Sequence, residues 1–161
     1  MNNTDTLMPA RIDASAYLAS GPGKAMLALQ HQVETSGLEH SLLELVKIRA
    51  SQINGCAYCI DMHTKDARAA GETEQRIYAL NAWRETPFFT DRERAALTWT
   101  ESVTRVADTH VPDDVHDRVR QVLSESDLVS LTWAVVAINA WNRLAVAFRA
   151  PVGTYTARTR A

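Results

Sequence analysis

The residues of this chain that could do chemistry lie close together in one short segment, Asn54 to His63. The segment holds the two cysteines of the chain, Cys56 and Cys59, and places His63 four residues after the second. Because positions three and four apart share one face of a helix, these side chains would form a stripe of two thiols and an imidazole. Such a stripe is typical of a redox-active or metal-binding site.

The two thiols would need activation before they could attack a substrate. A cysteine reacts as its thiolate, so its pKa must fall from about 8.5 toward neutrality. The free N–H groups and the dipole at a helix N-terminus favour such a charge, and a helix that begins at Cys56 would place Cys59 in its first turn. The dipole favours Cys56 as the more reactive thiol, whereas the proximity of His63 as proton acceptor favours Cys59. An oxidised Cys59 would have Cys56 ready to close a disulfide.

A histidine in this role needs an orienting partner, and Glu44 is the candidate. It lies twelve residues before Cys56, and two antiparallel helices joined at Asn54-Gly55 would bring it toward His63. The run from Ser41 to Glu44 also fits a capping box, in which the glutamate would only cap a helix. Nothing in the sequence forbids both roles.

Other interpretations of the cysteines and histidines are weaker. The cysteines could be small buried apolar residues, or they could bind structural zinc, but a closed zinc site needs four ligands and only three are contiguous here. We therefore expect neither a metal nor a cofactor. The remaining histidines have no chemical neighbours in the sequence and are expected on the surface or in loops: His31, His40, His110 and His116.

The elements that must position these residues all have helical periodicity, which predicts an all-α fold. The predicted helices are a stripe over 25–33 after the breaker Gly21-Pro22-Gly23, a helix ending near Asn54-Gly55, one from Cys56 to about Ala70, a short one over 73–83, one from a capping box at Thr90–Glu93 to Ala107, one of about ten residues after a break at 108–112, and a last helix capped by Ser124 or Ser126 that ends before Pro151.

Length and charge limit the function classes. The 161 residues and a hydrophobic fraction of 46% suit one domain over 1–161, with a motif core at about 40–100 and a polar tail from about 153. A formal net charge of −2 leaves no basic surplus for nucleic acid or an anionic membrane. The start, Met1–Thr6, lacks the features of a secretory signal, so we expect a cytoplasmic protein.

The apolar run from Leu128 to Phe148 approaches membrane-spanning length but contains Asn139, Asn142 and Arg143. A central charge is costly in lipid, so a buried helix of a soluble protein or oligomer explains it better. Large apolar side chains, including Trp133 and Trp141, surround its circumference and predict packing in the core or between subunits. A homo-oligomer is therefore expected.

Together, Glu44, the run Cys56-Ala57-Tyr58-Cys59 and His63 form the pattern Glu-x11-Cys-x2-Cys-x3-His, which resembles the core motif of AhpD-like alkylhydroperoxidases in the carboxymuconolactone decarboxylase superfamily. The resemblance covers roughly 18–152. It implies an all-α fold assembled as trimers or hexamers, and a thiol peroxidase in which Cys59 attacks a hydroperoxide, Cys56 resolves it, and Glu44 and His63 relay protons. It also implies an electron donor that is a dithiol, a thioredoxin-like protein or a lipoyl group.

One departure from this family pattern concerns Tyr58, which stands where the best-known AhpD proteins have a further histidine. The decarboxylase branch lacks the paired cysteines, so their presence favours redox chemistry over lactone decarboxylation. Two alternatives keep the same fold: a thiol-disulfide redox sensor or adaptor without peroxidase turnover, and a structural relative with a vestigial site.

Overall fold

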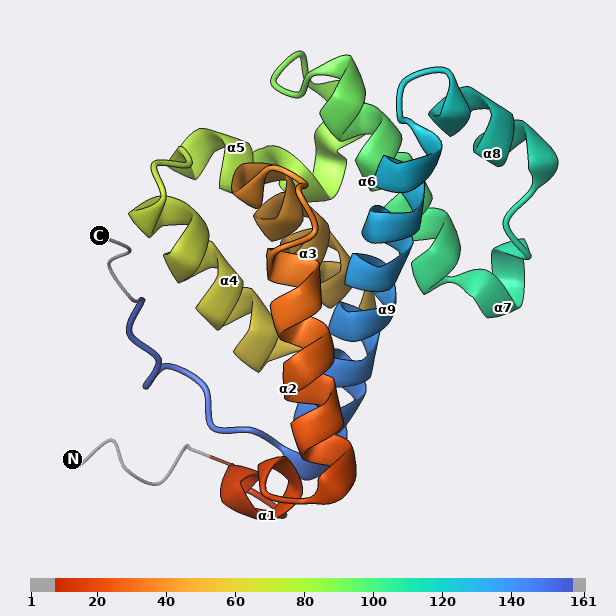
Figure 1. Ribbon diagram of the computed structural model, residues 1–161. Helices are drawn as coiled ribbons and strands as arrows, with labels where there is room; N and C mark the ends of the chain where they lie inside the picture. The colour runs from red at the N-terminus through yellow and green to blue at the C-terminus, as the bar shows by residue number, and fades with distance from the viewer. Residues whose placement is uncertain (1–7, 158–161) are drawn as a thin grey trace.

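The computed structural model describes residues 8–157, and within them the secondary structure is entirely helical, as the periodicity predicts (Figure 1). The helices in chain order are α1 (Ala14–Leu18), α2 (Gly21–Glu34), α3 (His40–Asn54), α4 (Ala57–Ala69), α5 (Glu74–Ala79), the 3-10 helix η1 (Leu80–Glu85), α6 (Asp91–Thr104), α7 (Val106–Thr109), α8 (Asp113–Arg120) and α9 (Glu125–Phe148). Met1–Thr6, where the sequence shows no features of a secretory signal, lie outside the described residues. The last part of the predicted polar tail also lies outside them.

Helix α3 lies at the centre of the arrangement. It packs against α4, α6 and α9, and ten consecutive residues, 42–51, are buried. Figure 1 shows α4 and α5 on one side of the molecule and α7 and α8 on the other. A helix buried around its whole circumference normally excludes charge, yet α3 buries Glu44, Lys47 and Arg49. Each must therefore find a polar partner inside the protein.

The turn between α3 and α4 forms where the sequence predicts it. Gly55 ends α3 in the left-handed conformation, with φ of 65°, and its N–H donates to the carbonyl of Gln52. The N–H of Cys56 donates back to the carbonyl of Ser51 at 3.0 Å. This turn reverses the chain, so that α4 packs along α3 and its first turn lies beside the last turn of α3.

Several helix ends differ from the prediction. The breaker Gly21-Pro22-Gly23 forms the first turn of α2, because Ser20 caps that helix and proline is tolerated there. Helix α6 ends at Thr104, where Arg105 separates it from α7, rather than continuing to Ala107. The predicted helix over 73–83 divides into α5 and η1, and the five-residue α1 was not expected.

Helix α9 is the one helix among the described residues that is long and apolar enough to cross a membrane. It packs against α2, α3, α4 and α6 and buries Asn142, which agrees with the predicted core helix. Within its most apolar stretch 33% of the residues are buried. Val129, Trp133 and Val136 are exposed, and Trp133 borders two surface cavities. One face of α9 is thus core, and the other is an apolar surface.

After α9 the tail returns to α4 (Figure 1). The N–H of Gly153 donates to Asp61, and Lys65 donates to the carbonyl of Tyr155 at 2.9 Å. The Tyr155 hydroxyl donates to a carboxylate oxygen of Asp66 at 2.8 Å. The polar tail, up to 157, is therefore anchored on the helix that carries the cysteines.

Candidate active site

The first turn of α4 is built around the sulfur of Cys56. This residue is the N-cap of the helix, with extended backbone angles, and its sulfur accepts the N–H of Cys59 at 3.4 Å. The prediction that the helix begins at Cys56 is confirmed. Both cysteines are free thiols and only 1% exposed. They pack with Ala50 of α3 and with Ile138 and Ala145 of α9.

The two thiols differ in their ionisation. The Cys59 thiol lies against the Cys56 sulfur, and this hydrogen bond is the largest of the effects that lower the pKa of Cys56 to about 7. Burial opposes it, while the backbone N–H of Cys59 and the side chain of Asn142 add to it. The same hydrogen bond and burial raise the pKa of Cys59. The pair therefore carries its negative charge on Cys56, as the helix dipole suggested.

Glu44 and His63 meet as the antiparallel arrangement predicts. The Nδ1 atom of His63 lies 2.9 Å from Oε2 of Glu44, and both side chains are buried. The Nζ atom of Lys47 donates to Oε1 of the same carboxylate at 2.9 Å. Burial by itself would raise the pKa of Glu44, but the hydrogen bond from His63 and the charges of His63 and Lys47 lower it to about 2. Glu44 is thus a buried carboxylate at neutral pH.

The capping interpretation of Glu44 is wrong. Helix α3 begins at His40, its N-cap is Glu39, and no side chain caps it. Glu44 lies in the second turn and points inward to His63. His40 also differs from the prediction of an unconnected histidine, because its Nε2 lies 3.6 Å from Oε1 of Glu44.

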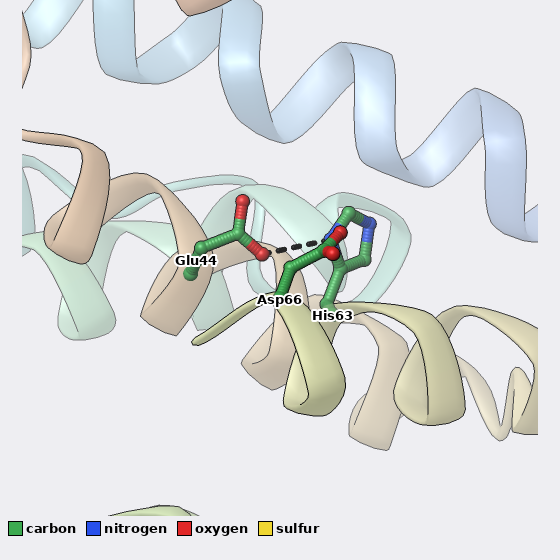
Figure 2. Close-up of side chains that lie close together, drawn as sticks. All are labelled: Glu44, His63 and Asp66. Carbon is green, nitrogen blue, oxygen red and sulfur yellow. Dashed lines mark hydrogen bonds and ion pairs between the residues drawn. The ribbon is translucent and has the colours of Figure 1, made fainter. Parts of the chain in front are cut away.

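A second carboxylate, Asp66, lies beside His63. Figure 2 shows the carboxylates of Glu44 from α3 and Asp66 from α4 next to the imidazole of His63, and the ligand atoms of these three residues lie within 4.8 Å of one another. By spacing alone they could hold a metal ion, a group that the sequence did not suggest. Lys47 on Glu44 and Tyr155 on Asp66 already occupy these carboxylates. The two cysteines are not part of this group.

Sequence reasoning missed the residues around the motif. Lys47 offered the signal of a lysine three residues after Glu44 on one helix, a spacing at which ion pairs form. Asp66 lies three residues after His63 in the same way. Asn142 and Tyr155 are 83 or more residues from Cys59 along the chain and carried no local signal.

Comparison with known proteins places this geometry in context. The model of the family described as carboxymuconolactone decarboxylase matches residues 23–102, which include Glu44, both cysteines and His63. The uncharacterized protein YdfG of Bacillus subtilis is 46% identical over 124 residues, which are 77% of this chain and 84% of that protein. The uncharacterized protein YnjA of Escherichia coli is 28% identical over 97 residues, 60% of this chain and 53% of that protein.

Solved structures share the fold. A protein of unknown function from Agrobacterium tumefaciens, described as a putative antioxidant defence protein AhpD, superposes with a TM-score of 0.86 and is 44% identical; the match covers 91% of this chain and all, 100%, of that one. The debrominase Bmp8 superposes with a TM-score of 0.74 at 17% identity, over 82% of this chain and 71% of its own. The second likeness concerns the fold alone.

Proposed function

Because this chain belongs to the carboxymuconolactone decarboxylase family and has the AhpD-like fold, we propose that it reduces alkyl hydroperoxides or hydrogen peroxide through a Cys56–Cys59 disulfide. The observation that carries the proposal is the hydrogen-bonded pair of thiols at the start of α4, with the pKa of Cys56 lowered to about 7. A thiolate at neutral pH beside a second thiol is what peroxide reduction and disulfide closure require.

The proposed reaction has two steps. A thiolate sulfur attacks the terminal peroxide oxygen, the O–O bond breaks, and the released alkoxide takes a proton and leaves as an alcohol, so that the sulfur becomes a sulfenic acid. The second sulfur then attacks the sulfenic sulfur, the S–O bond breaks, and hydroxide takes a proton to give water. The two cysteines lose two electrons in all, and an external dithiol restores them as it becomes a disulfide.

We assign the peroxide-attacking role to Cys59 and the resolving role to Cys56, as the family resemblance implies. In the resting pair the charge resides on Cys56, so the proton of Cys59 must first move to the Cys56 sulfur or to His63. His63 lies one turn after Cys59, and Glu44 fixes the orientation of its ring. We propose that His63 carries this proton and returns it to the leaving oxygen.

Steady-state peroxide consumption with several dithiol donors, run beside a Cys59→Ser control, tests the proposed activity. We expect turnover by the native chain, none by the control, and intact mass after alkylation that shows loss of both free thiols on mild oxidation. Residues three apart on a helical turn reach disulfide distance with little backbone movement. Two alkylated thiols after peroxide treatment would contradict the disulfide and with it the mechanism.

The second candidate function is a thiol-disulfide redox sensor or adaptor, in which the same disulfide forms but turnover is negligible. Tyr58 favours it, since this side chain packs against the buried cluster that contains the cysteines, at the position where the best-known AhpD proteins carry a further relay histidine. Disulfide formation by one equivalent of peroxide without steady-state consumption would select this function. A site that does neither would be the vestigial relative.

The remaining features of the proposal concern partners and place. We propose a dithiol, thioredoxin-like or lipoyl reductant, and a trimer or hexamer of this chain in the cytoplasm. Val129, Trp133 and Val136 on the exposed face of α9 support self-association, because exposed apolar side chains gathered on one helix face are usually covered by another subunit.

A further inference from the structure

We propose that the carboxamide of Asn142 on α9 stabilises the thiolate of the Cys56–Cys59 pair by donating a hydrogen bond to it, a role that deepens the proposed thiol chemistry and rests on it. Asn142 is only 1% exposed. Ile138 and Ala145, one turn to either side of it, belong to the same buried cluster as the two cysteines. The face of α9 that carries Asn142 is therefore the face that covers the thiols.

The direction of the Asn142 amide is fixed by a chain of side chains that begins at Asn139. The Nδ2 of Asn139 donates to the carbonyl of Val135 at 2.9 Å, and its Oδ1 accepts from the guanidinium of Arg143 at 3.1 Å. A backbone carbonyl can only accept and a guanidinium can only donate. The side-chain oxygen of Asn139 therefore faces Arg143, and the amide cannot flip to exchange its oxygen and its NH2 group.

Asn54, at the end of α3, transmits this orientation. Its Nδ2 donates to Oδ1 of Asn139 at 3.0 Å and to Oδ1 of Asn142 at 2.8 Å. Since Asn139 presents an oxygen, Asn54 must present its NH2 group, and Asn142 must in turn present an oxygen to Asn54. The NH2 group of Asn142 is therefore directed away from Asn54, toward Ser51 and the cysteines.

Ser51 takes only one of the two N–H groups of Asn142. The Ser51 hydroxyl donates its hydrogen bond to the carbonyl of Lys47 at 2.7 Å. Its oxygen therefore accepts the hydrogen bond from Nδ2 of Asn142 at 3.0 Å. One N–H of Asn142 is left for sulfur, and a hydrogen bond with this side chain acts to lower the pKa of both Cys56 and Cys59. A hydrogen bond with Ser51 also acts to lower the pKa of Cys59.

Such a donor matters because the thiols are buried. A buried anion is costly unless fixed dipoles replace its hydration, and a donor already held in place adds no cost of reorientation when the charge forms. The motif on α4 supplies the sulfurs and the backbone N–H of Cys59, while α9 supplies this amide. Asn142 would therefore act on the same charge from a helix more than eighty residues away.

The test measures thiol ionisation from the pH dependence of iodoacetamide alkylation, with the modified cysteine identified by mass spectrometry. Asn142→Ala should raise the pKa of the alkylated thiol by about one to two, the usual effect of one hydrogen bond to a charged group. From a pKa of about 7 for Cys56, this rise leaves about 5- to 50-fold less thiolate at pH 7. Ser51→Ala is the matched control. It removes a partner of Asn142 and a hydrogen bond that acts on Cys59, but it leaves the Asn142 amide in place, so the pKa of Cys56 should rise less than in Asn142→Ala.

The outcomes separate the possible roles. An unchanged Cys56 pKa in folded Asn142→Ala, or an equal or larger rise in Ser51→Ala, would overturn the proposal. If the role of Asn142 were only structural, Asn142→Ala would lower the unfolding free energy and leave the thiol pKa unchanged. If Asn142→Ala does not fold, Asn54→Ala decides, because it frees the amide to turn: a smaller rise supports the proposal and an unchanged pKa overturns it.

The ionisation assay uses no peroxide, so this proposal and the proposed function fail separately. If the native chain turns over peroxide but Asn142→Ala leaves the thiol pKa unchanged, only the proposed role of the Asn142 amide is refuted. A shifted thiol pKa in a chain without turnover would support the amide and refute the peroxidase.

Discussion

Replacing Cys59 with alanine should raise the pKa of Cys56, because the change removes the thiol that hydrogen-bonds to its sulfur. The pKa of Cys56 is about 7 instead of 9.0, and this bond is the largest cause of the lowering. At pH 7 about half of such a thiol is ionised, against about 1% for a pKa of 9. A lower pKa also makes the thiolate about tenfold less nucleophilic, so the net rate advantage at neutral pH is about fivefold.

The backbone N–H of residue 59 and the Asn142 amide remain in this variant, so we expect the Cys56 pKa to rise by about one to two. Alkylation followed from mildly acidic to alkaline pH reports the midpoint directly, and the midpoint is independent of how accessible the buried sulfur is. Cys59→Ser is the matched control, because its hydroxyl still donates and should preserve most of the lowering. A Cys56 midpoint that does not move in Cys59→Ala, or a native chain in which Cys59 is alkylated first, would refute this account of the pair.

Other substitutions test the relay, the acid stability and the exposed face of α9. Glu44→Gln and His63→Gln should each slow peroxide reduction by about 10- to 10,000-fold, and the double variant should be barely slower than the worse single, since groups that act as a unit are not additive. If steady-state kinetics show that the two losses of activation free energy add in the double variant, Glu44 and His63 do not act as one unit. The pKa of Glu44 is lowered from 4.5 to about 2, so its carboxylate stabilises the fold above about pH 4.5 by about 3 kcal/mol and this contribution is lost as pH falls toward 2. The free energy of unfolding, measured with denaturant, should therefore fall as pH falls over this range in the native chain and fall less in Glu44→Gln. The same dependence of this free energy on pH in both chains would contradict the buried ion pair. Trp133→Arg should reduce the oligomer seen by light scattering at micromolar concentration, and a native chain that is monomeric there would refute self-association through this face.

Local signals predicted the parts of the fold whose cause is local. Gly55 adopts the left-handed conformation that ends α3, Thr90 and Glu93 form a reciprocal capping box, and Ser124 caps α9. The contact of Glu44 with His63 was also predictable, because an antiparallel helix pair with a tight turn fixes which positions face each other. Each of these features depends on residues that are close in sequence or that lie on two helices joined by a single tight turn.

The rest depends on packing between distant segments. Helix α1 is too short for a periodic signal and is held in part by the stacking of Tyr17 on Phe148, across most of the chain. The amide chain that orients Asn142 joins α3 to α9, and the tail that reaches Asp66 returns from beyond α9. No spacing rule announces such contacts, since they follow from the angles at which whole helices pack.

The cap formed by Cys56 links helix order to reduction potential. Its sulfur holds the N–H of Cys59 while it is a free thiolate, but in a disulfide the same sulfur is neutral and bonded elsewhere, so it is a poorer acceptor. The first turn of α4 therefore stabilises the reduced pair, and stabilising the reduced form makes a disulfide a stronger oxidant. We therefore expect the proposed Cys56–Cys59 disulfide to be readily reduced by a dithiol, and the backbone amides at the start of α4 should exchange hydrogen faster when the pair is oxidised.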